Sequence, residues 1–365
     1  MTNPPIAQAF QRRMDEFLKE KPESPSVLLL VDSPGLLWKG ASGFADPKNV
    51  VAIQPDAAIY IASVAKTMTA TIALRLVEEG LLDLDALLPA YLPEDLLDGL
   101  HRFDGRSYDT LITVRHLLGH QSGLADSFGS PGFMDLILGD PDRIWKPRES
   151  VEFIKEHCKP LFAPGKGFNY SDVNYNLVGL AIEAVTGRSL DDAYRRYIYD
   201  PLGMRSTYRR LVEPPTAEGS HQVAHVFYGD IDFTAWRALT ADWAGGGLNS
   251  TTADLNRFIR ALVGNRAFRK PSTRNSMFLW RPWSDNASYG LGLMRFDFER
   301  DSDASRHGLG EIWGHIGASG CFMFYWPRQD TSFCGTFNQV ACEREILPFV
   351  VDLMRLVESS CPLPS

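Results

Sequence analysis

Apolar residues at helical spacing define the clearest predicted element. From Val64 to Leu76 an apolar side chain recurs every four residues, which is the period of one buried helix face. Gly80 is well placed to end this helix, because glycine readily adopts the left-handed conformation found just after helix C-termini. The pattern predicts a buried helix that begins directly after Ser63.

Short apolar runs typical of buried strands lie near both ends of the chain. The first is Val27–Val31, and a Ser-Pro-Gly turn follows it. The later runs are at 289–294, 311–315, 321–326 and 331–337. Helical patterns dominate between the two ends, at 150–158, 177–185 and 190–199.

This distribution predicts a fold of the mixed α/β (α+β) class. Residues 1–62 and 240–365 would form a mixed domain with a central antiparallel sheet and flanking helices. Residues 63–239 would form a mainly helical inserted domain, and we expect the active site between the two domains.

Two glycine-rich segments interrupt these patterns. Residues 125–147 are rich in Gly, Pro and Asp, which predicts a loop over a site or a surface excursion. Gly245, Gly246 and Gly247 lie together, but the Lys-Ser/Thr of a phosphate-binding loop does not follow them. We interpret this second segment as a tight approach between backbones.

Composition narrows the classes of function. A net charge of −8 argues against an electrostatic nucleic-acid binder. No apolar run has transmembrane length and no signal-peptide pattern is visible, so we expect a cytoplasmic protein without a membrane anchor. Five scattered cysteines, none in Cys-x-x-Cys, favour reduced thiols over disulfides or a zinc site.

The first candidate chemistry is a single Ser-x-x-Lys motif at Ser63 and Lys66. Residues three apart share a helix face, so Lys66 would lie against the Ser63 hydroxyl. A desolvated lysine can activate a serine, and a helix N-terminus favours a developing anion. Such a motif also arises by chance, with a helix interior or cap as its structural interpretation.

His116 and His120 are four residues apart, which raises the possibility of a metal site. The intervening glutamate of His-Glu-x-x-His is missing, and no third ligand is evident. We therefore interpret both histidines as structural, and we expect no metal and no cofactor.

Two further motifs follow in order, Tyr-Ser-Asp at 170–172 and His-Ile-Gly at 315–317. With Ser63 and Lys66 they resemble the Ser-x-x-Lys, Tyr-x-Asn and Lys-Thr-Gly motifs of the serine β-lactamase and penicillin-binding-protein superfamily. The resemblance is to its class C β-lactamase-like branch, with D-Ala-D-Ala carboxypeptidases, D-aminopeptidases and esterases. It covers nearly the whole chain and implies a β-lactamase/transpeptidase-like fold.

The resemblance also implies roles for individual residues. Ser63 would be the nucleophile that forms an acyl-enzyme, with either Lys66 or Tyr170 as its base. Tyr170 can act as a base only if cations such as Lys66 and a protonated His315 depress its pKa. The N–H groups of Ser63 and Ala318 would form the oxyanion hole.

The neighbouring glycine and the departures from the family pattern refine this expectation. Gly317 would let the strand edge approach the substrate backbone. Asp172 replaces Asn, and an ionised carboxylate accepts hydrogen bonds but cannot donate them. Ile316 replaces a residue whose hydroxyl, in the family, helps to bind a substrate carboxylate. His315 replaces Lys, which makes the positive charge pH-dependent. These changes favour a less anionic substrate than a β-lactam.

An apolar acyl pocket is a further hypothesis, although each of its members is equally well interpreted as core. Its aromatic candidates, together with Ile316, are Phe128, Tyr228, Trp236 and Trp243.

The predicted function is a serine hydrolase that acts through an acyl-enzyme on small esters, amides or D-amino-acid peptides. Its partner would be a small-molecule substrate. One alternative is an acyltransferase on the same scaffold, and another is a weak β-lactamase or DD-peptidase. A third is a non-catalytic, penicillin-binding-like sensor, a hypothesis that Asp172 keeps open.

Overall fold

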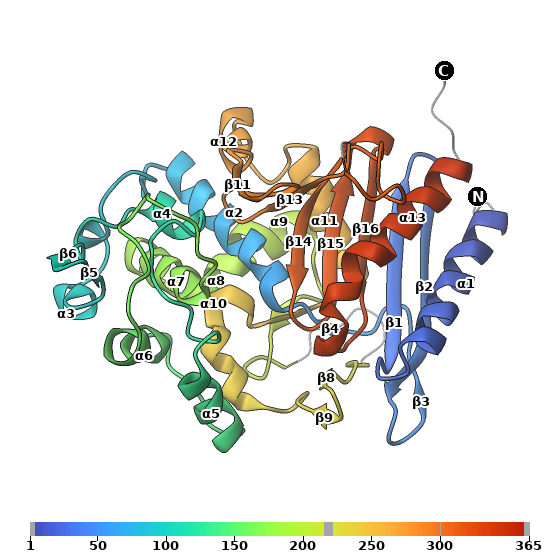
Figure 1. Cartoon of the computed structure of the whole chain (residues 1–365), viewed down its shortest axis with the longest axis horizontal. Coiled ribbons are helices and arrows are strands. Elements are labelled where there is room, and N and C mark those ends of the chain that lie inside the picture. Colours follow the sequence, from blue (N-terminus) through green and yellow to red (C-terminus); the bar gives the residue numbers. More distant parts are fainter. Residues whose placement is uncertain (1–3, 215–221, 300, 361–365) are drawn as a thin grey trace.

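An antiparallel sheet forms one side of the computed structural model, which describes residues 4–214, 222–299 and 301–360 (Figure 1). In this part of the chain the sheet has nine strands, in the order β11-β12-β13-β14-β15-β16-β1-β2-β3. The strands are β1 (Ser26–Ser33), β2 (Leu36–Asp46), β3 (Val51–Ala52), β11 (Arg281–Ser284), β12 (Ala287–Tyr289), β13 (Met294–Asp297), β14 (Glu311–Gly317), β15 (Cys321–Trp326) and β16 (Thr331–Thr336).

Helices cover both faces of this sheet. The first and last helices, α1 (Pro4–Glu20) and α13 (Ile346–Ser360), lie side by side on one face (Figure 1), while α11 (Thr252–Val263) packs on the other. Strands buried on both faces need apolar residues at every position rather than at alternate ones. This is why β1 and β15 are nearly continuous apolar runs in the sequence.

Most helices of the described chain lie between the two groups of strands that form the sheet. The remaining helices are α2 (Ala65–Glu78), α3 (Glu94–Leu97), α4 (Val114–Leu118), α5 (Pro131–Gly139), α6 (Glu149–His157), α7 (Asp172–Thr186), α8 (Leu190–Tyr194), α9 (Asp200–Leu202), α10 (Trp243–Gly246) and α12 (Pro271–Met277). Short strands connect them: β4 (Ile59–Tyr60), β5 (Arg102–Phe103), β6 (Arg106–Ser107), β7 (Tyr208–Arg209), β8 (Phe227–Tyr228), β9 (Ile231–Asp232) and β10 (Leu248–Ser250).

Local signals in the sequence explain several helix ends. Gly80 and Gly187 both follow helices and have left-handed backbones, with φ of 72° and 62°. Thr113 caps α4 by accepting a hydrogen bond from the backbone N–H of His116. The segment 125–147 differs from its prediction, because it contains the helix α5, which begins at a proline.

A second, three-stranded sheet brings distant segments together near Ser63. β10 lies between β4 and β7, with Asn249 opposite both Tyr60 and Tyr208. The glycine-rich segment before β10 is thereby held against the start of α2. In the described part of the chain, no helix has both the length and the apolar character needed to cross a membrane.

Candidate active site

Ser63 lies in a 3-10 turn, Ala62–Val64, that leads into α2. It is the single partly exposed residue between Ala57 and Leu74, in a stretch that is otherwise buried. Ala62 directly before it has a φ of 44°, a left-handed conformation that is uncommon without glycine. The turn therefore presents the Ser63 hydroxyl at the edge of the core and holds it in a strained backbone.

The end of β14 packs directly on this turn. A Cβ atom on Gly317 would lie 2.4 Å from the carbonyl oxygen of Ile61, so glycine is required for this contact. Gly317 thus allows a close approach to the Ser63 turn itself. The next residue, Ala318, is exposed, and the Ser319 hydroxyl donates a 2.6 Å hydrogen bond to the carbonyl of Tyr60.

Lys66 is fully buried, and three oxygen atoms surround its ammonium group. Nζ lies 3.0 Å from Oγ of Ser63 and 2.9 Å from the carbonyl oxygen of Gly245, and it forms an ion pair with Asp172. An ammonium group has three protons to donate, so these partners satisfy it completely. The i, i+3 placement predicted from the sequence is confirmed.

The glycine-rich segment forms the wall behind Lys66. A Cβ atom on Gly245 would lie 2.5 Å from Oδ1 of Asp242 and 3.1 Å from Nζ of Lys66. On Gly246 it would lie 1.8 Å from Oδ2 of Asp242. The interpretation of this segment as a tight backbone approach is therefore confirmed.

Two further carboxyl groups, those of Asp126 and Asp242, interact electrostatically with the Lys66–Asp172 pair. Asp126 accepts hydrogen bonds from the N–H groups of Asp172 (2.9 Å) and Gly129 (2.8 Å), yet desolvation and the charge of Asp172 raise its pKa to about 7. Desolvation and Asp172 also raise the pKa of Asp242 well above its usual range. Asp126 and Asp242 therefore bind protons at a higher pH than ordinary aspartates do.

Lys66 itself keeps its proton. Desolvation lowers its pKa, but the fields of Asp172, Tyr170 and Asp242 outweigh that effect and raise the pKa well above its ordinary value. The resting site thus contains a Lys66 ammonium paired with the Asp172 carboxylate.

Tyr170 lies over this ion pair, with its ring centroid 5.1 Å from Nζ of Lys66. On its other side it stacks on His120, at 4.2 Å between ring centroids. Desolvation raises the pKa of Tyr170 well above its usual value, although Lys66 acts in the opposite direction. The condition under which Tyr170 could act as a base is therefore not met in the resting site, where Tyr170 is a neutral phenol.

His315 is fully buried on β14, and the structure corrects its expected charge. Its Nδ1 lies 2.7 Å from the carbonyl oxygen of Ile316, which can only accept, so we assign the proton to Nδ1. Its Nε2 then accepts from the Tyr289 hydroxyl at 3.0 Å. Burial lowers the pKa of His315 to about 3, so its ring is neutral rather than cationic.

The structure does not gather the five predicted pocket residues in one place. Ile316 packs against the apolar cluster beneath α13, because successive strand residues face opposite sides of a sheet. Phe128 contacts Phe133, and Trp236 joins a small cluster with Tyr60 and Phe233. Tyr228 is exposed, and Trp243 is buried against Gly179.

The two histidines considered as metal ligands bind backbone groups. Nδ1 of His116 accepts from the N–H of Thr113 at 3.2 Å, and Nδ1 of His120 accepts from the N–H of Ser171 at 3.1 Å. His120 therefore fixes the segment that carries Tyr170.

Sequence reasoning missed four residues of this site: Asp126, His120 as a support for Tyr170, Asp242 and Tyr289. Each lies in or beside a feature that was noticed, namely the histidine pair at 116 and 120, the segment 125–147, the glycine triplet and the apolar run at 289–294. Residue type and spacing alone did not distinguish them from surface acids and core aromatics.

Comparisons with known proteins show which proteins the chain is similar to. The model of the family described as Beta-lactamase matches residues 7–346. Esterase EstB of Burkholderia gladioli is 32% identical over 224 residues, which are 57% of this chain and 53% of the esterase. D-aminopeptidase of Brucella anthropi is 27% identical over 197 residues, which are 53% of this chain and 35% of that protein.

A solved D-stereospecific amidohydrolase from Streptomyces sp. is similar over nearly the whole length. It is 26% identical, and the match covers 98% of this chain and 99% of the amidohydrolase with a TM-score of 0.77. The chain spans about half the length of the curated relatives it matches first, at 57%, 53% and 48%.

Proposed function

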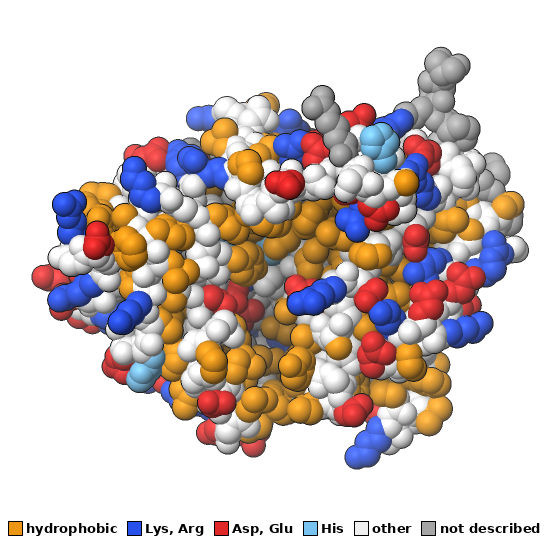
Figure 2. Space-filling view, viewed as in Figure 1, with side chains coloured by type: hydrophobic (Ala, Val, Ile, Leu, Met, Phe, Trp, Pro, Cys, Tyr) orange, Lys and Arg blue, Asp and Glu red, His pale blue; other side chains and the backbone are white. Residues whose placement is uncertain are grey.

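The chain belongs to the beta-lactamase family, and on that premise we propose that it is a serine hydrolase that forms an acyl-enzyme on Ser63. One observation carries the proposal: the single partly exposed hydroxyl in a buried stretch lies 3.0 Å from a fully buried lysine ammonium. We place the site between the mixed domain of residues 1–62 and 240–365 and the helical domain of residues 63–239. Figure 2 shows a hollow on this side of the molecule, with acidic side chains inside an apolar rim.

The ion pair supplies the base for acylation. When the Lys66 ammonium passes a proton to the Asp172 carboxylate, Lys66 becomes a neutral amine within reach of the Ser63 hydroxyl. The amine takes the serine proton as Oγ bonds to the substrate carbonyl carbon. An asparagine at position 172 could not take that proton, so in an Asp172→Asn variant the free amine would form only by loss of the Lys66 proton to solvent.

Tyr170 then acts as the general acid for the leaving group. As a neutral phenol above Lys66, it donates its proton to the departing amine or alcohol while the carbonyl C–N or C–O bond breaks. Lys66 reprotonates the phenolate. The N–H groups of Ser63 and Ala318 stabilise the oxyanion, and water releases the acid from the acyl-enzyme.

The charges of the site favour a substrate with a free amino group. Desolvation and the negative charge of Asp172 raise the pKa values of Asp126 and Asp242. A bound ammonium group would reduce the repulsion among these carboxylates, whereas a bound carboxylate would increase it. We therefore propose small esters and amides as substrates, including D-amino-acid amides, ahead of β-lactams. The names of the similar esterase, aminopeptidase and amidohydrolase support this class.

The test compares wild type with Ser63→Ala on p-nitrophenyl acetate, D-phenylalanine amide and nitrocefin. We expect wild type to cleave the first two much faster than nitrocefin, and Ser63→Ala to lose activity by at least about a thousandfold. Mass spectrometry should detect an acyl adduct on wild type alone. Full activity of Ser63→Ala would overturn the proposal, and an added alcohol in the same assay measures acyl transfer.

A further inference from the structure

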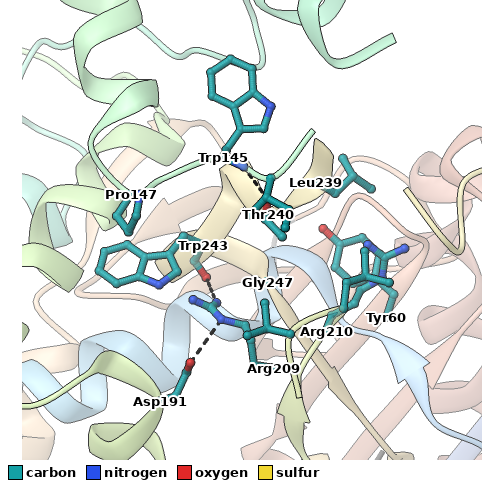
Figure 3. A pocket seen from close by; sticks show the side chains of 13 residues that line it. Tyr60, Trp145, Pro147, Asp191, Arg209, Arg210, Leu239, Thr240, Trp243 and Gly247 are labelled. Atoms are coloured by element: carbon teal, nitrogen blue, oxygen red, sulfur yellow. Dashed lines mark hydrogen bonds and ion pairs between the residues drawn. The ribbon is translucent and has the colours of Figure 1, made fainter. Parts of the chain in front are cut away.

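A pocket that Ser63 does not line is bordered by Trp243 and Gly247 of the glycine-rich segment (Figure 3). Its volume is about 180 Å³, and none of Ser63, Lys66, Tyr170, Asp172 and His315 lines it. Its walls come from β4, the loop after α5, α8, β7, the 3-10 helix at 237–242 and α10. The mechanism proposed above makes no use of it.

The walls of this pocket suit a flat apolar ring. In Figure 3, Pro147 and Trp243 lie on one side of the pocket, Leu239 on the other, and Trp145 above them. An apolar cavity of about 150 Å³ holds one benzene molecule, so this volume accommodates a single six-membered ring with one small substituent. The loop that carries Trp145 is fixed there, because its N–H donates to the Thr240 hydroxyl at 2.9 Å.

The charged groups of the pocket carry one excess positive charge. Arg209 pairs with Asp191 at 3.2 Å and donates to the carbonyl of Trp243 at 2.6 Å. Arg210, only 5% exposed, donates through Nη2 to the carbonyls of Phe233 (2.9 Å) and Thr234 (2.6 Å). In the described part of the chain no carboxylate forms an ion pair with Arg210, and desolvation lowers its pKa. The Asp232 carboxylate acts on Arg210 only from beyond ion-pair distance, so this buried cation favours an anionic ligand in the pocket.

Tyr60 supplies a donor beside this cation. Its ring stacks under the Arg210 guanidinium, 4.5 Å from the ring centroid, and Figure 3 shows its hydroxyl directed into the pocket toward Thr240. The Tyr60 side chain is 93% buried, since its exposure is 7%. In the described part of the chain no hydrogen bond engages the Tyr60 hydroxyl, and burial raises its pKa, so it keeps its proton.

We propose that this pocket binds a small monocyclic carboxylate of the size of benzoate. Its carboxylate would meet Arg210 and the Tyr60 hydroxyl, and its ring would lie between Trp243 and Leu239. Hydrogen bonds between a guanidinium and a carboxylate are among the stronger ones in proteins, and the apolar walls remove the ring from water. The proposal does not depend on acylation of Ser63.

The test is a titration of the intact protein with 4-fluorobenzoate, followed by the ¹⁹F NMR signal, with 4-fluorobenzamide as an uncharged probe. We expect the carboxylate to bind and the amide to bind at least about tenfold more weakly. Arg210→Met should weaken carboxylate binding by about tenfold or more, and Tyr60→Phe by less. Arg237→Met is the matched control, because Arg237 is an exposed arginine outside the pocket; it should change nothing.

A second variant, which fills the pocket with a larger side chain, tests the proposal even if Arg210→Met does not fold. Leu239→Trp should abolish binding while circular dichroism shows an intact fold. Absence of binding to wild type, or undiminished binding to Arg210→Met and Leu239→Trp, would overturn the proposal. So would equal binding of the acid and the amide.

Steady-state kinetics show whether the ligand of this pocket is the acyl group of a substrate or a separate acid. If 4-fluorobenzoate competes with p-nitrophenyl benzoate but not with p-nitrophenyl acetate, the pocket takes the acyl group of a substrate. If it does not compete with either ester, the pocket takes a separate acid. Competition with both esters that persists in Leu239→Trp would place the acid at Ser63 and overturn the proposal.

Discussion

At the scale of single residues, the unusual feature is a carboxylate where the family motif has an amide. Asp172 pairs with a lysine that is completely buried. Its charge opposes the desolvation of Lys66 and keeps that lysine protonated at rest. The same carboxylate can receive the proton when the serine is activated, so Asp172 affects both the ground state and the chemistry.

Asp172→Asn should shift the acidic limb of the pH–rate profile to lower pH. Asp172 raises the pKa of Lys66, so its removal lowers that pKa and the free amine forms at lower pH. The measurement is kcat/KM for p-nitrophenyl acetate from pH 5 to 9. An unchanged profile would show that Asp172 does not control the protonation of Lys66.

Tyr289→Phe should lower kcat by about tenfold and leave KM nearly unchanged, because Nε2 of His315 loses its 3.0 Å hydrogen bond. We expect a loss of unfolding free energy of about 1 kcal/mol, measured in urea. Tyr325→Phe is the matched control, since the Tyr325 hydroxyl donates to Asp330 at 2.9 Å and does not contact His315. Equal kcat losses in both variants would argue against a specific role for Tyr289.

At the scale of elements, short segments rather than long helices bring the site together. The Ser63 turn, the end of β14 and the glycine-rich α10 meet where side chains larger than hydrogen do not fit. Backbone carbonyls and N–H groups can therefore act directly on the reacting atoms. Such contacts leave little freedom for substitution.

Gly245→Ala should reduce kcat by at least about a hundredfold, because its Cβ would displace Asp242 or Lys66. Activity on p-nitrophenyl acetate is the measurement, with circular dichroism to verify folding. Gly139→Ala is the control, since a Cβ on Gly139 would have no neighbour within 4 Å. Retained activity in Gly245→Ala would contradict the tight packing around Lys66.

At the scale of the whole molecule, burial of several acids in one site links stability to pH. Folding buries Asp126 and places it beside Asp172, and these two effects raise its pKa from 3.8 to about 7. The folded protein therefore holds a proton on Asp126 that the unfolded chain has already lost. The free energy of unfolding therefore falls as pH rises from about 4 to about 7, because ionised Asp126 is unfavourable only in the folded state.

Asp126→Asn should remove this dependence. Relative to wild type, the Tm of the variant should improve as pH rises from about 4 to about 7, and the difference should then level off. Loss of one acceptor for the Gly129 N–H lowers the Tm by a constant amount, so the slope with pH is the readout. Parallel Tm curves for the two proteins would show that Asp126 does not titrate in this range.

Much of the fold follows from patterns along the chain. The period of four after Ser63 determined a buried helix, and the glycines at 80 and 187 determined where helices end, because these depend on local backbone geometry. Continuous apolar runs predicted strands covered on both faces. The loop predicted at 125–147 hid a short helix, since its Gly and Pro residues outweighed its apolar ones.

Spacing along the chain was enough to predict the order of the motifs and the i, i+3 contact between Ser63 and Lys66, because spacing sets which residues are neighbours on one helix face. The charges of the site depend on the folded arrangement. Whether His315 is cationic, whether Tyr170 can lose its proton and which acids surround Lys66 all depend on desolvation and on groups far apart in the chain. Electrostatic energies follow distances and burial in three dimensions, and neither quantity can be read from spacing along a sequence.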